Sequence, residues 1–535
     1  MTCTKKEKYI GALISSAIGD ALGWPNEQNS RNISLKVDNI KTFVSWNRKC
    51  GGRYWPYVEK IAEGEYSDDT QLIIGTLRSL LRGNQWSNFF RRVELPAWLS
   101  YERGGGGATK RAAKKWKMDS SPWDEKNNSQ NEIKSYFNAG GNGVAMRILP
   151  HVFCNENNYE KVMSQVVLNG MYTHGHPRAL IGAMLYACAI NKILEQEGTL
   201  AYGELVDYLI DKRVIWSKLP DVNNMNLWKL EAKKYSGYDY DAEWDKCIEE
   251  TIELLYICQK SLNQGILDIS SNTLELLGCF DSRINGAGNR SAVISIYLFS
   301  KYADNPYMAI CEAANLKSAD TDTLASMVGG IVGSLNGISW IPVELRAIQD
   351  FEMYKILIEQ LLDGKCDYFD DARKYQLFDS NRLSYSKVGD TIQCIPFGEM
   401  KLIDIRDEKA MSRGMYVKTF IWTTCYKQTV FSKKIGKIEK DNKENIEFSK
   451  EDKSLKKNEF RLSKDNLYEI QIILGKMKET QVFIEIFGEI MDLQNENLNK
   501  KQENEAINKM KEKWKEYRLT KKQILAVRKI LTSEK

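Results

Sequence analysis

The sequence predicts a compact all-α helical bundle over residues 1–387, followed by a smaller α+β domain over residues 388–535. With 535 residues, the chain is too long for one ordinary domain. Apolar residues recur at three- and four-residue spacing up to about residue 385, where strand-like alternation is scarce. After Pro396, the last proline, the composition shifts toward β-branched and aromatic residues.

The helical periodicity of the first part is clearest in five segments, which loops bearing Gly or Pro separate. These segments are 70–82, 160–196, 245–262, 290–301 and 322–336. Two predicted helices also carry small residues at a spacing of four, a pattern that lets helices approach closely. The small residues are Gly11, Ser15 and Gly19 in one helix, and Ala325, Gly329 and Gly333 in the other. Close packing alone explains them as well as a functional role does.

The second part reads as strands followed by helices. Segments 390–404 and 414–432 are rich in Val, Ile, Thr and aromatic residues and predict strands. Residues 433–460 are rich in Lys, Glu and Asn, which predicts a linker or a solvated loop. In the last predicted helix, Thr520 and Gln523 have the spacing of a capping box.

The composition narrows the functional class. A formal net charge of +5 is small for this length and implies no particular partner. Eleven cysteines without a CxxC pair, and only three histidines, argue against a zinc site and favour reduced cysteines in a cytoplasmic protein. The apolar run near the N-terminus lacks a convincing cleavage site, and no stretch approaches the ~18 apolar residues of a membrane span.

Two short acidic clusters are the most informative feature of the chain. Residues 67–70 (SDDT) and 320–323 (DTDT) each place two carboxylates and two hydroxyls at the start of a predicted helix. Helix capping explains one such cluster, since Ser and Asp satisfy free N–H groups there. Capping does not explain two matched clusters. If the fold brings them together, their oxygen-only ligands favour a binuclear Mg²⁺, Mn²⁺ or Ca²⁺ centre.

Three further segments are candidates for a site. The glycine-rich loop at 140–143 offers backbone N–H groups that suit an anion such as a diphosphate, although ordinary turns use the same residues. Residues 173–177 contain two of the three histidines, which suit either orientation of a substrate or a structural turn. Glu27 follows a tight glycine turn and suits a further metal ligand or a base.

Taken together and in this order, the segments resemble the ADP-ribosylglycohydrolase family, which includes the dinitrogenase-reductase-activating glycohydrolase and the vertebrate ADP-ribosyl-acceptor hydrolases. The resemblance spans residue 8 to about residue 350. The matching motifs are GDALGWPNE at 19–27, YSDDTQL at 66–72, ERGGGGATK at 102–110, GNGVAMRILP at 141–150, THGHPRA at 173–179 and ADTDTLASMVGGIVGSLNG at 319–337.

The resemblance implies an all-α catalytic fold that holds two Mg²⁺ ions, with Mn²⁺ as an alternative, and hydrolyses a bond between ADP-ribose and an acceptor. The implied metal ligands are Ser67, Asp68, Asp69, Asp320, Asp322 and Thr323. Glu27 and Asp69 are the implied catalytic carboxylates, and either is a candidate base. The implied substrate-binding residues are Gly141, Asn142, Gly143, His174 and His176. Ser67 stands where the family usually has Thr, and Ala319 stands where it usually has Gly.

Three kinds of acceptor fit the resemblance: a protein side chain, a nucleic acid and a small molecule. A non-catalytic ADP-ribose-binding module that recruits a partner through the C-terminal domain is the alternative function, although such a module does not need every acidic ligand. A third hypothesis gives the C-terminal domain a nucleic-acid role, with Trp514 and Tyr517 as stacking residues. Acidic residues interleave with the lysines of 433–460, so no basic stripe supports it.

Overall fold

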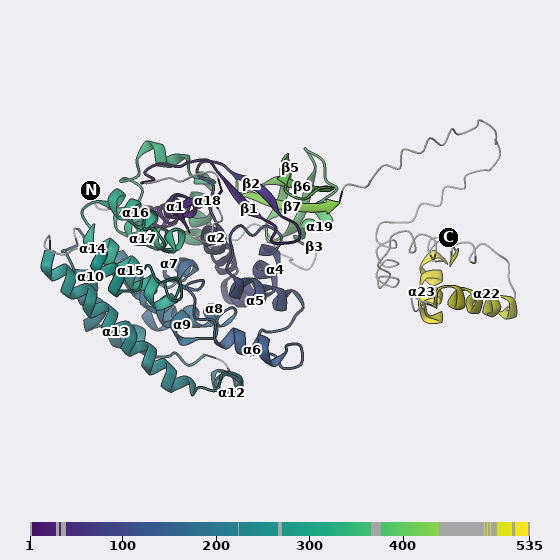
Figure 1. The fold of residues 1–535 in the computed structure, drawn as a ribbon, viewed down its shortest axis with the longest axis horizontal. Coiled ribbons are helices and arrows are strands. Elements are labelled where there is room, and N and C mark those ends of the chain that lie inside the picture. Colours follow the sequence, from purple (N-terminus) through teal and green to yellow (C-terminus); the bar gives the residue numbers. More distant parts are fainter. Residues whose placement is uncertain are drawn as a thin grey trace. The chain divides into compact units, whose positions relative to one another are not determined.

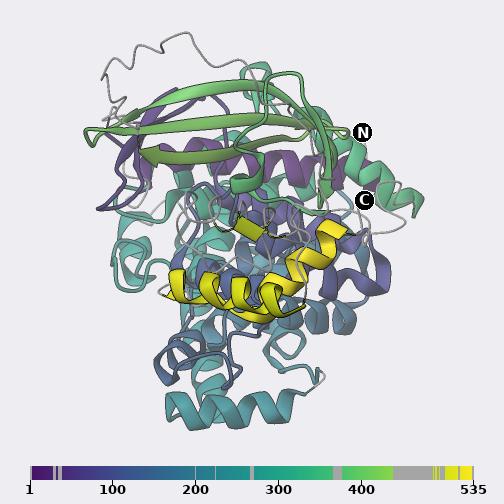
Figure 2. The same ribbon diagram turned by 90° about the vertical axis from the view of Figure 1, so that its right-hand side faces the viewer.

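The computed structural model describes most of the chain and divides it into two compact units, Met1–Lys440 and Asp441–Lys535. The described residues are 3–27, 32–33, 39–198, 200–222, 224–265, 270–364, 376–437, 486, 489–490, 493, 500–515 and 519–532. The first unit combines a helical body with a sheet that forms a layer along one of its sides (Figures 1 and 2).

The helical body confirms the periodicity, because each of the five predicted segments contains one or two of its helices. These helices are α1 (Lys5–Gly23), α2 (Asp68–Leu80), α3 (Trp86–Phe89), α4 (Leu95–Trp98), α5 (Gly107–Lys117), α6 (Gln130–Phe137), α7 (Leu149–Cys154), α8 (Tyr159–Met171), α9 (Pro177–Glu195), α10 (Glu204–Asp211), α11 (Arg213–Ser217), α12 (Met225–Ser236), α13 (Tyr240–Gln264), α14 (Ser270–Leu276), α15 (Gly288–Lys301), α16 (Pro306–Ala314), α17 (Thr321–Asn336), α18 (Phe351–Asp363) and α19 (Ser380–Leu383).

Helices α1 and α17 pack backbone against backbone through the two predicted stripes of small residues. A Cβ atom added to Gly19 would lie 2.0 Å from the Ala325 carbonyl oxygen. One added to Gly329 would lie 2.0 Å from the Ser15 carbonyl oxygen. No real Cβ atom tolerates such distances, so the helices approach as closely as they do only because these positions are glycines. The predicted close approach is confirmed.

Within the described residues, seven strands form the sheet, and those after residue 390 confirm the predicted strand segments. The strands are β1 (Trp46–Cys50), β2 (Tyr57–Ile61), β3 (Gln376–Leu377), β4 (Thr391–Ile395), β5 (Gly398–Ala410), β6 (Met415–Thr424) and β7 (Thr429–Lys437). Their order is β1-β2-β5-β4-β3, and β6 pairs with both β5 and β7. All pairs are antiparallel except β3–β4.

The sheet corrects the expectation that the first part is all-α. Strands β1 and β2 form a hairpin within the first 61 residues, and β2 pairs with β5 through Tyr57–Ala410 and Val58–Lys409. The fold is therefore helix-rich with a sheet region built mainly from its later residues. The domain boundary that we predicted after residue 387 falls inside the first unit, because this pairing joins strands from both sides of it.

Buried polar contacts attach the later strands to the helical body. Arg78 of α2 forms an ion pair of 2.7 Å with Glu94 and donates hydrogen bonds to Tyr426 and Gln428 in the β6–β7 turn. Asp350, which precedes α18, accepts hydrogen bonds from the Tyr66 hydroxyl at 2.7 Å and from the Thr429 N–H at 2.9 Å. The attachment thus depends in part on buried polar groups.

Two helices, α22 (Lys500–Lys513) and α23 (Lys521–Thr532), make up most of the described part of the second unit. The predicted capping box is confirmed, since the Thr520 N–H donates to Gln523 and the Gln523 N–H donates to the Thr520 hydroxyl. The Trp514 ring is buried and its indole N–H donates to Glu489 at 3.0 Å, so it is not presented for base stacking. Residues 438–460 and Tyr517 lie outside the described residues.

Among the helices that the structure describes, none combines the length and the hydrophobicity that crossing a membrane requires.

The substitution Gly329→Ala tests the α1–α17 contact. The added methyl group would meet the Ser15 carbonyl at 2.0 Å, so the helices must separate, and we expect the free energy of unfolding to fall by about 2 kcal/mol or more. Urea unfolding followed by circular dichroism measures this change. Gly106→Ala is the control, because a Cβ atom at Gly106 has no neighbour within 4 Å. Equal stability of Gly329→Ala and the unmodified chain would contradict the packing argument.

The substitution Asp350→Asn tests the sheet attachment through its pH dependence. Burial raises the pKa of Asp350 from 3.8 to about 6. The folded state therefore binds a proton on this carboxyl more tightly than the unfolded state does. The stability that this difference contributes is present at low pH and is lost as the pH rises through about 6. The difference in free energy of unfolding between Asp350→Asn and the unmodified chain should therefore shift by about 2 kcal/mol in favour of the variant when the pH rises from 4.5 to 7.5. Urea unfolding at both pH values measures the difference, and a difference independent of pH would refute the assignment.

Candidate functional site

The fold brings the two acidic clusters together at the starts of α2 and α17. The Thr323 hydroxyl donates a hydrogen bond of 3.3 Å to Asp69 Oδ2 and so joins the clusters directly. Ser67 is the N-cap of α2, and its hydroxyl accepts from the Asp69 N–H. Asp68, Asp69 and Asp322 are buried. Residues separated by about 250 positions thus face one another, as the binuclear hypothesis requires.

Glu27 completes the acidic group from a third direction. It directly follows the 3₁₀ turn η1 (Trp24–Asn26), which continues from the end of α1. Carboxylate oxygens of Glu27, Asp320 and Asp322 all lie within 4.8 Å of one another. The structure therefore unites Glu27 with the second cluster.

Asp20, for which the sequence predicts no role, orients the first cluster. This fully buried side chain of α1 accepts hydrogen bonds from the Ser67 N–H at 2.9 Å, the Thr70 N–H at 3.0 Å and the Thr70 hydroxyl at 2.6 Å. It thereby holds the start of α2 against α1. The signal was present in the sequence, since the one carboxylate in the mainly apolar residues 9–23 is expected to have buried partners.

Burial and mutual repulsion dominate the electrostatics of these carboxylates, and the charges of Arg48 and Lys110 offset them only in part. Burial raises the pKa of Asp68 to about 8, and burial with neighbouring carboxylates raises the pKa values of Asp69, Asp322 and Glu27 well above their ordinary range. No described Lys or Arg forms an ion pair with any of these four. The folded chain therefore concentrates negative charge that a cation would offset.

The donor set fits hard divalent cations. Every candidate ligand is a carboxylate or hydroxyl oxygen, the chemistry that Mg²⁺, Mn²⁺ and Ca²⁺ prefer. Asp69 Oδ1 is buried and has no hydrogen-bond partner among the described residues. A buried carboxylate oxygen without a partner is costly unless a ligand satisfies it. The residues present are thus suited to a metal centre.

The predicted glycine-rich loop lies against this acidic group. Its backbone pairs with the loop before α15, because the Asn142 N–H donates to the Gly286 carbonyl and the Gly288 N–H donates to the Gly140 carbonyl, both at 2.9 Å. The Asn142 side-chain amide donates to Asp320 Oδ2 at 2.8 Å. Asn142 therefore links the loop to the second cluster, which places the loop at the site.

The two predicted histidines occupy different places. His174 is buried, its Nδ1 lies 2.7 Å from the Thr173 hydroxyl, and a Cβ atom added to Gly143 would lie 2.9 Å from its ring. Burial lowers the pKa of His174 to about 3, so the ring is neutral near pH 7. His176 caps α9 by accepting the Arg178 N–H at 3.2 Å. His174 thus lines the glycine loop, while His176 also has a structural role.

Two cavities meet at the acidic group. The larger, of about 760 Å³, is lined by Asp68, Asp69, Asn142, His174 and part of the sheet. The smaller, of about 650 Å³, is lined by His176, Arg178, Arg283 and Asn285. Glu27, Gly141 and Asp320 line both. A substrate that reaches the carboxylates can therefore extend in two directions.

Gly104, one of the glycines at 104–107 that the resemblance includes without a site role, lies against Asp68. Gly104 has a φ of +106°, and an added Cβ atom would lie 3.0 Å from Asp68 Oδ1. Only glycine adopts this backbone conformation at so short a distance without strain. Local sequence gives no sign that this loop lies over the first cluster.

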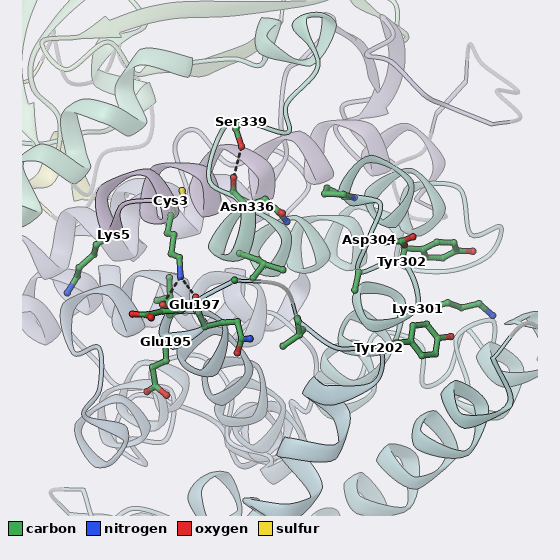
Figure 3. A pocket seen from close by; sticks show the side chains of 18 of the residues that line it. Cys3, Lys5, Glu195, Glu197, Tyr202, Lys301, Tyr302, Asp304, Asn336 and Ser339 are labelled. Atoms are coloured by element: carbon green, nitrogen blue, oxygen red, sulfur yellow. Dashed lines mark hydrogen bonds between the residues drawn. The ribbon is translucent and has the colours of Figure 1, made fainter. Parts of the chain in front are cut away.

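A third and larger hollow, of about 1810 Å³, is lined by residues near the N-terminus (Figure 3). Several of its charged groups have structural partners, since Lys8 donates to the carbonyls of Leu194 and Gln196, and Lys5 pairs with Glu156 at 2.5 Å. None of the described residues that line it belongs to the predicted site. Volume alone therefore does not locate the function.

Three comparisons relate this chain to known proteins. The family model described as ADP-ribosylglycohydrolase matches residues 1–373. The curated protein "Uncharacterized protein YegU" from Escherichia coli (strain K12) is 24% identical over 359 residues, which cover 65% of this chain and 92% of that protein. A solved structure titled "ADP-ribosylglycohydrolase-related protein complex" is 18% identical, with a TM-score of 0.42, and the match covers 68% of this chain and 99% of that one.

The substitution Asp69→Asn tests the mutual repulsion of the carboxylates. In EDTA, a neutral amide removes one of several buried like charges, so the free energy of unfolding should rise by about 1 kcal/mol or more. Thermal and urea unfolding in EDTA measure this change. When Mg²⁺ is added, the unmodified chain should be stabilised more than the variant.

Asp363→Asn is the matched control, because Asp363 is exposed at the end of α18. It should change the stability by less than about 0.5 kcal/mol under both conditions. If Asp69→Asn is less stable than the unmodified chain in EDTA, the carboxylates do not destabilise one another as argued.

Proposed function

Because the chain belongs to the ADP-ribosylglycohydrolase family, we propose that it is a metal-dependent hydrolase that cleaves the glycosidic bond between ADP-ribose and an acceptor. The observation that carries the proposal is the meeting of the two acidic clusters with Glu27 beside the glycine-rich loop. Substrates of this family are ADP-ribosylated, and the acceptor here is a protein, a nucleic acid or a small molecule. We further propose that the protein acts in the cytoplasm.

The cofactor is two Mg²⁺ ions, with Mn²⁺ as a substitute. Their ligands are Ser67, Asp68, Asp69, Asp320, Asp322 and Thr323, and Glu27 lies close enough to Asp320 and Asp322 to join them. When bound, such ions lower the pKa of a water molecule and hold sugar hydroxyls. The unpartnered Asp69 Oδ1 and the raised pKa values of the carboxylates support this assignment.

Two carboxylates are candidates for the base that takes a proton from the attacking water. Asp69 has one oxygen held by Thr323 and the other free, so Oδ1 is the atom that accepts a proton or a ligand. Glu27 lines both cavities. The surrounding carboxylates also stabilise the positive charge that develops on the sugar in an oxocarbenium-like transition state.

The glycine-rich loop positions the ADP-ribose. Gly141, Asn142 and Gly143 place backbone against the cavity where a diphosphate needs close approach, and Asn142 is fixed by Asp320. His174 stays neutral near pH 7 and so contributes a hydrogen-bonding ring rather than a charge. His176 lines the smaller cavity from the start of α9.

Release of ADP-ribose tests the proposal. The acceptor panel comprises arginine-, serine-, aspartate- and nucleic-acid-linked ADP-ribose and acetyl-ADP-ribose, each assayed with Mg²⁺ and with EDTA. We expect Mg²⁺-dependent release from at least one acceptor. In Asp320→Asn the rate should fall by more than about a hundredfold, since the loss of a direct ligand exceeds the 10–100-fold effect of outer partners.

Asp304→Asn is the control for the loss of one carboxylate, because Asp304 is exposed at the hollow near the N-terminus. It should leave the rate unchanged. Tight binding of ADP-ribose without release from any acceptor would refute the hydrolase and favour a binding module that recruits a partner.

A further inference from the structure

One wall of the larger cavity comes in part from residues beyond the family match. The match ends at residue 373, whereas Ser380, Phe431, Lys433 and Ile435 line the cavity. The β1–β2 hairpin, which lies against the later strands (Figure 1), supplies the rest of this wall. We call the β7 residues 431–435 and the hairpin residues 48–57 that line the cavity the sheet wall.

The charged residues of the sheet wall that line the cavity are all basic. They are Arg48, Lys49 and Lys433. The same cavity is also lined by the acidic residues Asp68, Asp69, Asp320 and Asp322. The cavity therefore has an acidic side suited to cations and a basic side suited to anions.

A buried carboxylate behind the sheet wall holds two of its cations in place. Glu59 of β2 lies 2.7 Å from Lys433 Nζ and 3.7 Å from Arg48 Nη1, and it also pairs with Arg103 at 3.0 Å. The Glu59 side chain is only 2% exposed, whereas those of Lys433 and Arg48 are 16% and 15% exposed. The carboxylate is thus hidden, and the cations keep a face toward the cavity.

The position of the sheet wall indicates which part of the substrate it meets. ADP-ribose is common to the substrates of the family, and the proposed residues for it lie within the matched region. Lys433 lies outside that region and lines the same cavity. A feature that this chain adds to the shared fold is expected to contact the variable part of the substrate, which is the acceptor.

We propose that the sheet wall, through Lys433 and Arg48, selects acceptors that carry an anionic group, a phosphate or a carboxylate, next to the linkage to ADP-ribose. Lys433 and Arg48 are specificity-determining residues here, since neither is among the proposed catalytic residues. The inference rests on the proposed hydrolase function and adds its substrate class.

The experiment uses the full chain and the linkage cleaved in the acceptor panel. That linkage is presented on three acceptors that differ only in the neighbouring group, which is a neutral amide, a carboxylate or a phosphate ester. We expect kcat/KM for at least one anionic acceptor to exceed that for the neutral acceptor by about tenfold, the value of one charge-assisted hydrogen bond. The carboxylate and phosphate arms identify which anion is preferred.

Lys433→Met should abolish this preference while leaving kcat/KM for the neutral acceptor and the affinity for free ADP-ribose unchanged. Lys433→Arg should retain the preference. Lys434→Met is the matched control, since Lys434 is the next residue of β7, donates to the Ser384 hydroxyl and does not line the cavity. Arg48→Met provides a second test if Lys433→Met binds free ADP-ribose poorly and is therefore misfolded.

The outcomes separate the two proposals. If the unmodified chain cleaves the linkage but shows no preference for anionic acceptors, or if Lys433→Met and Arg48→Met both keep the preference, the inference about the sheet wall is overturned and the hydrolase stands. If the unmodified chain releases ADP-ribose from no acceptor in the panel, the hydrolase is overturned, and the selection of acceptors falls with it.

Discussion

The contact between α1 and α17 is the constraint on which the site depends. Glycines let the two backbones touch along their length, and the contact continues to the end of α1, where a Cβ atom on Gly23 would lie 2.2 Å from the Thr321 carbonyl. The Thr321 hydroxyl donates back to the Gly23 carbonyl at 2.8 Å. Because Asp20 and Glu27 flank Gly23, and Thr321 separates Asp320 from Asp322, this one contact sets the spacing of carboxylates from two distant segments.

The structure contains buried carboxylates in two opposite environments. Glu59 is surrounded by Lys433, Arg103 and Arg48, which hold its pKa below the ordinary range despite its burial. Asp69 has carboxylate neighbours and no such cation, so its pKa is raised. The first environment stabilises a charged group within the fold. The second environment lowers the stability of the protein when no ligand is bound. Such a destabilising arrangement is expected where residues bind a ligand rather than support the fold.

Much of the fold was predictable because it depends on local patterns. Local patterns of a few residues predict the helical periodicity, the capping box at Thr520 and the strand composition after residue 390. The ordered motifs indicate the family. The pairing of β2 with β5 was not predictable, because it joins positions about 350 residues apart and a five-residue hairpin strand carries little periodicity. The acidic clusters were found as motifs, whereas Asp20 and Lys433 act through neighbours that only the tertiary structure reveals.

The attachment of the sheet also bears on how this chain can be divided. Helix α2 begins with Asp68 and Asp69 and, near its other end, presents Arg78 to the β6–β7 turn and to the ring of Phe397, 4.8 Å away. A protein shortened to the family region would lose these partners and expose the apolar surface that Phe378 and Phe397 cover beside Tyr101. The sheet therefore acts as an inseparable part of the folding unit, and recombinant expression of residues 1–373 alone is expected to give insoluble protein.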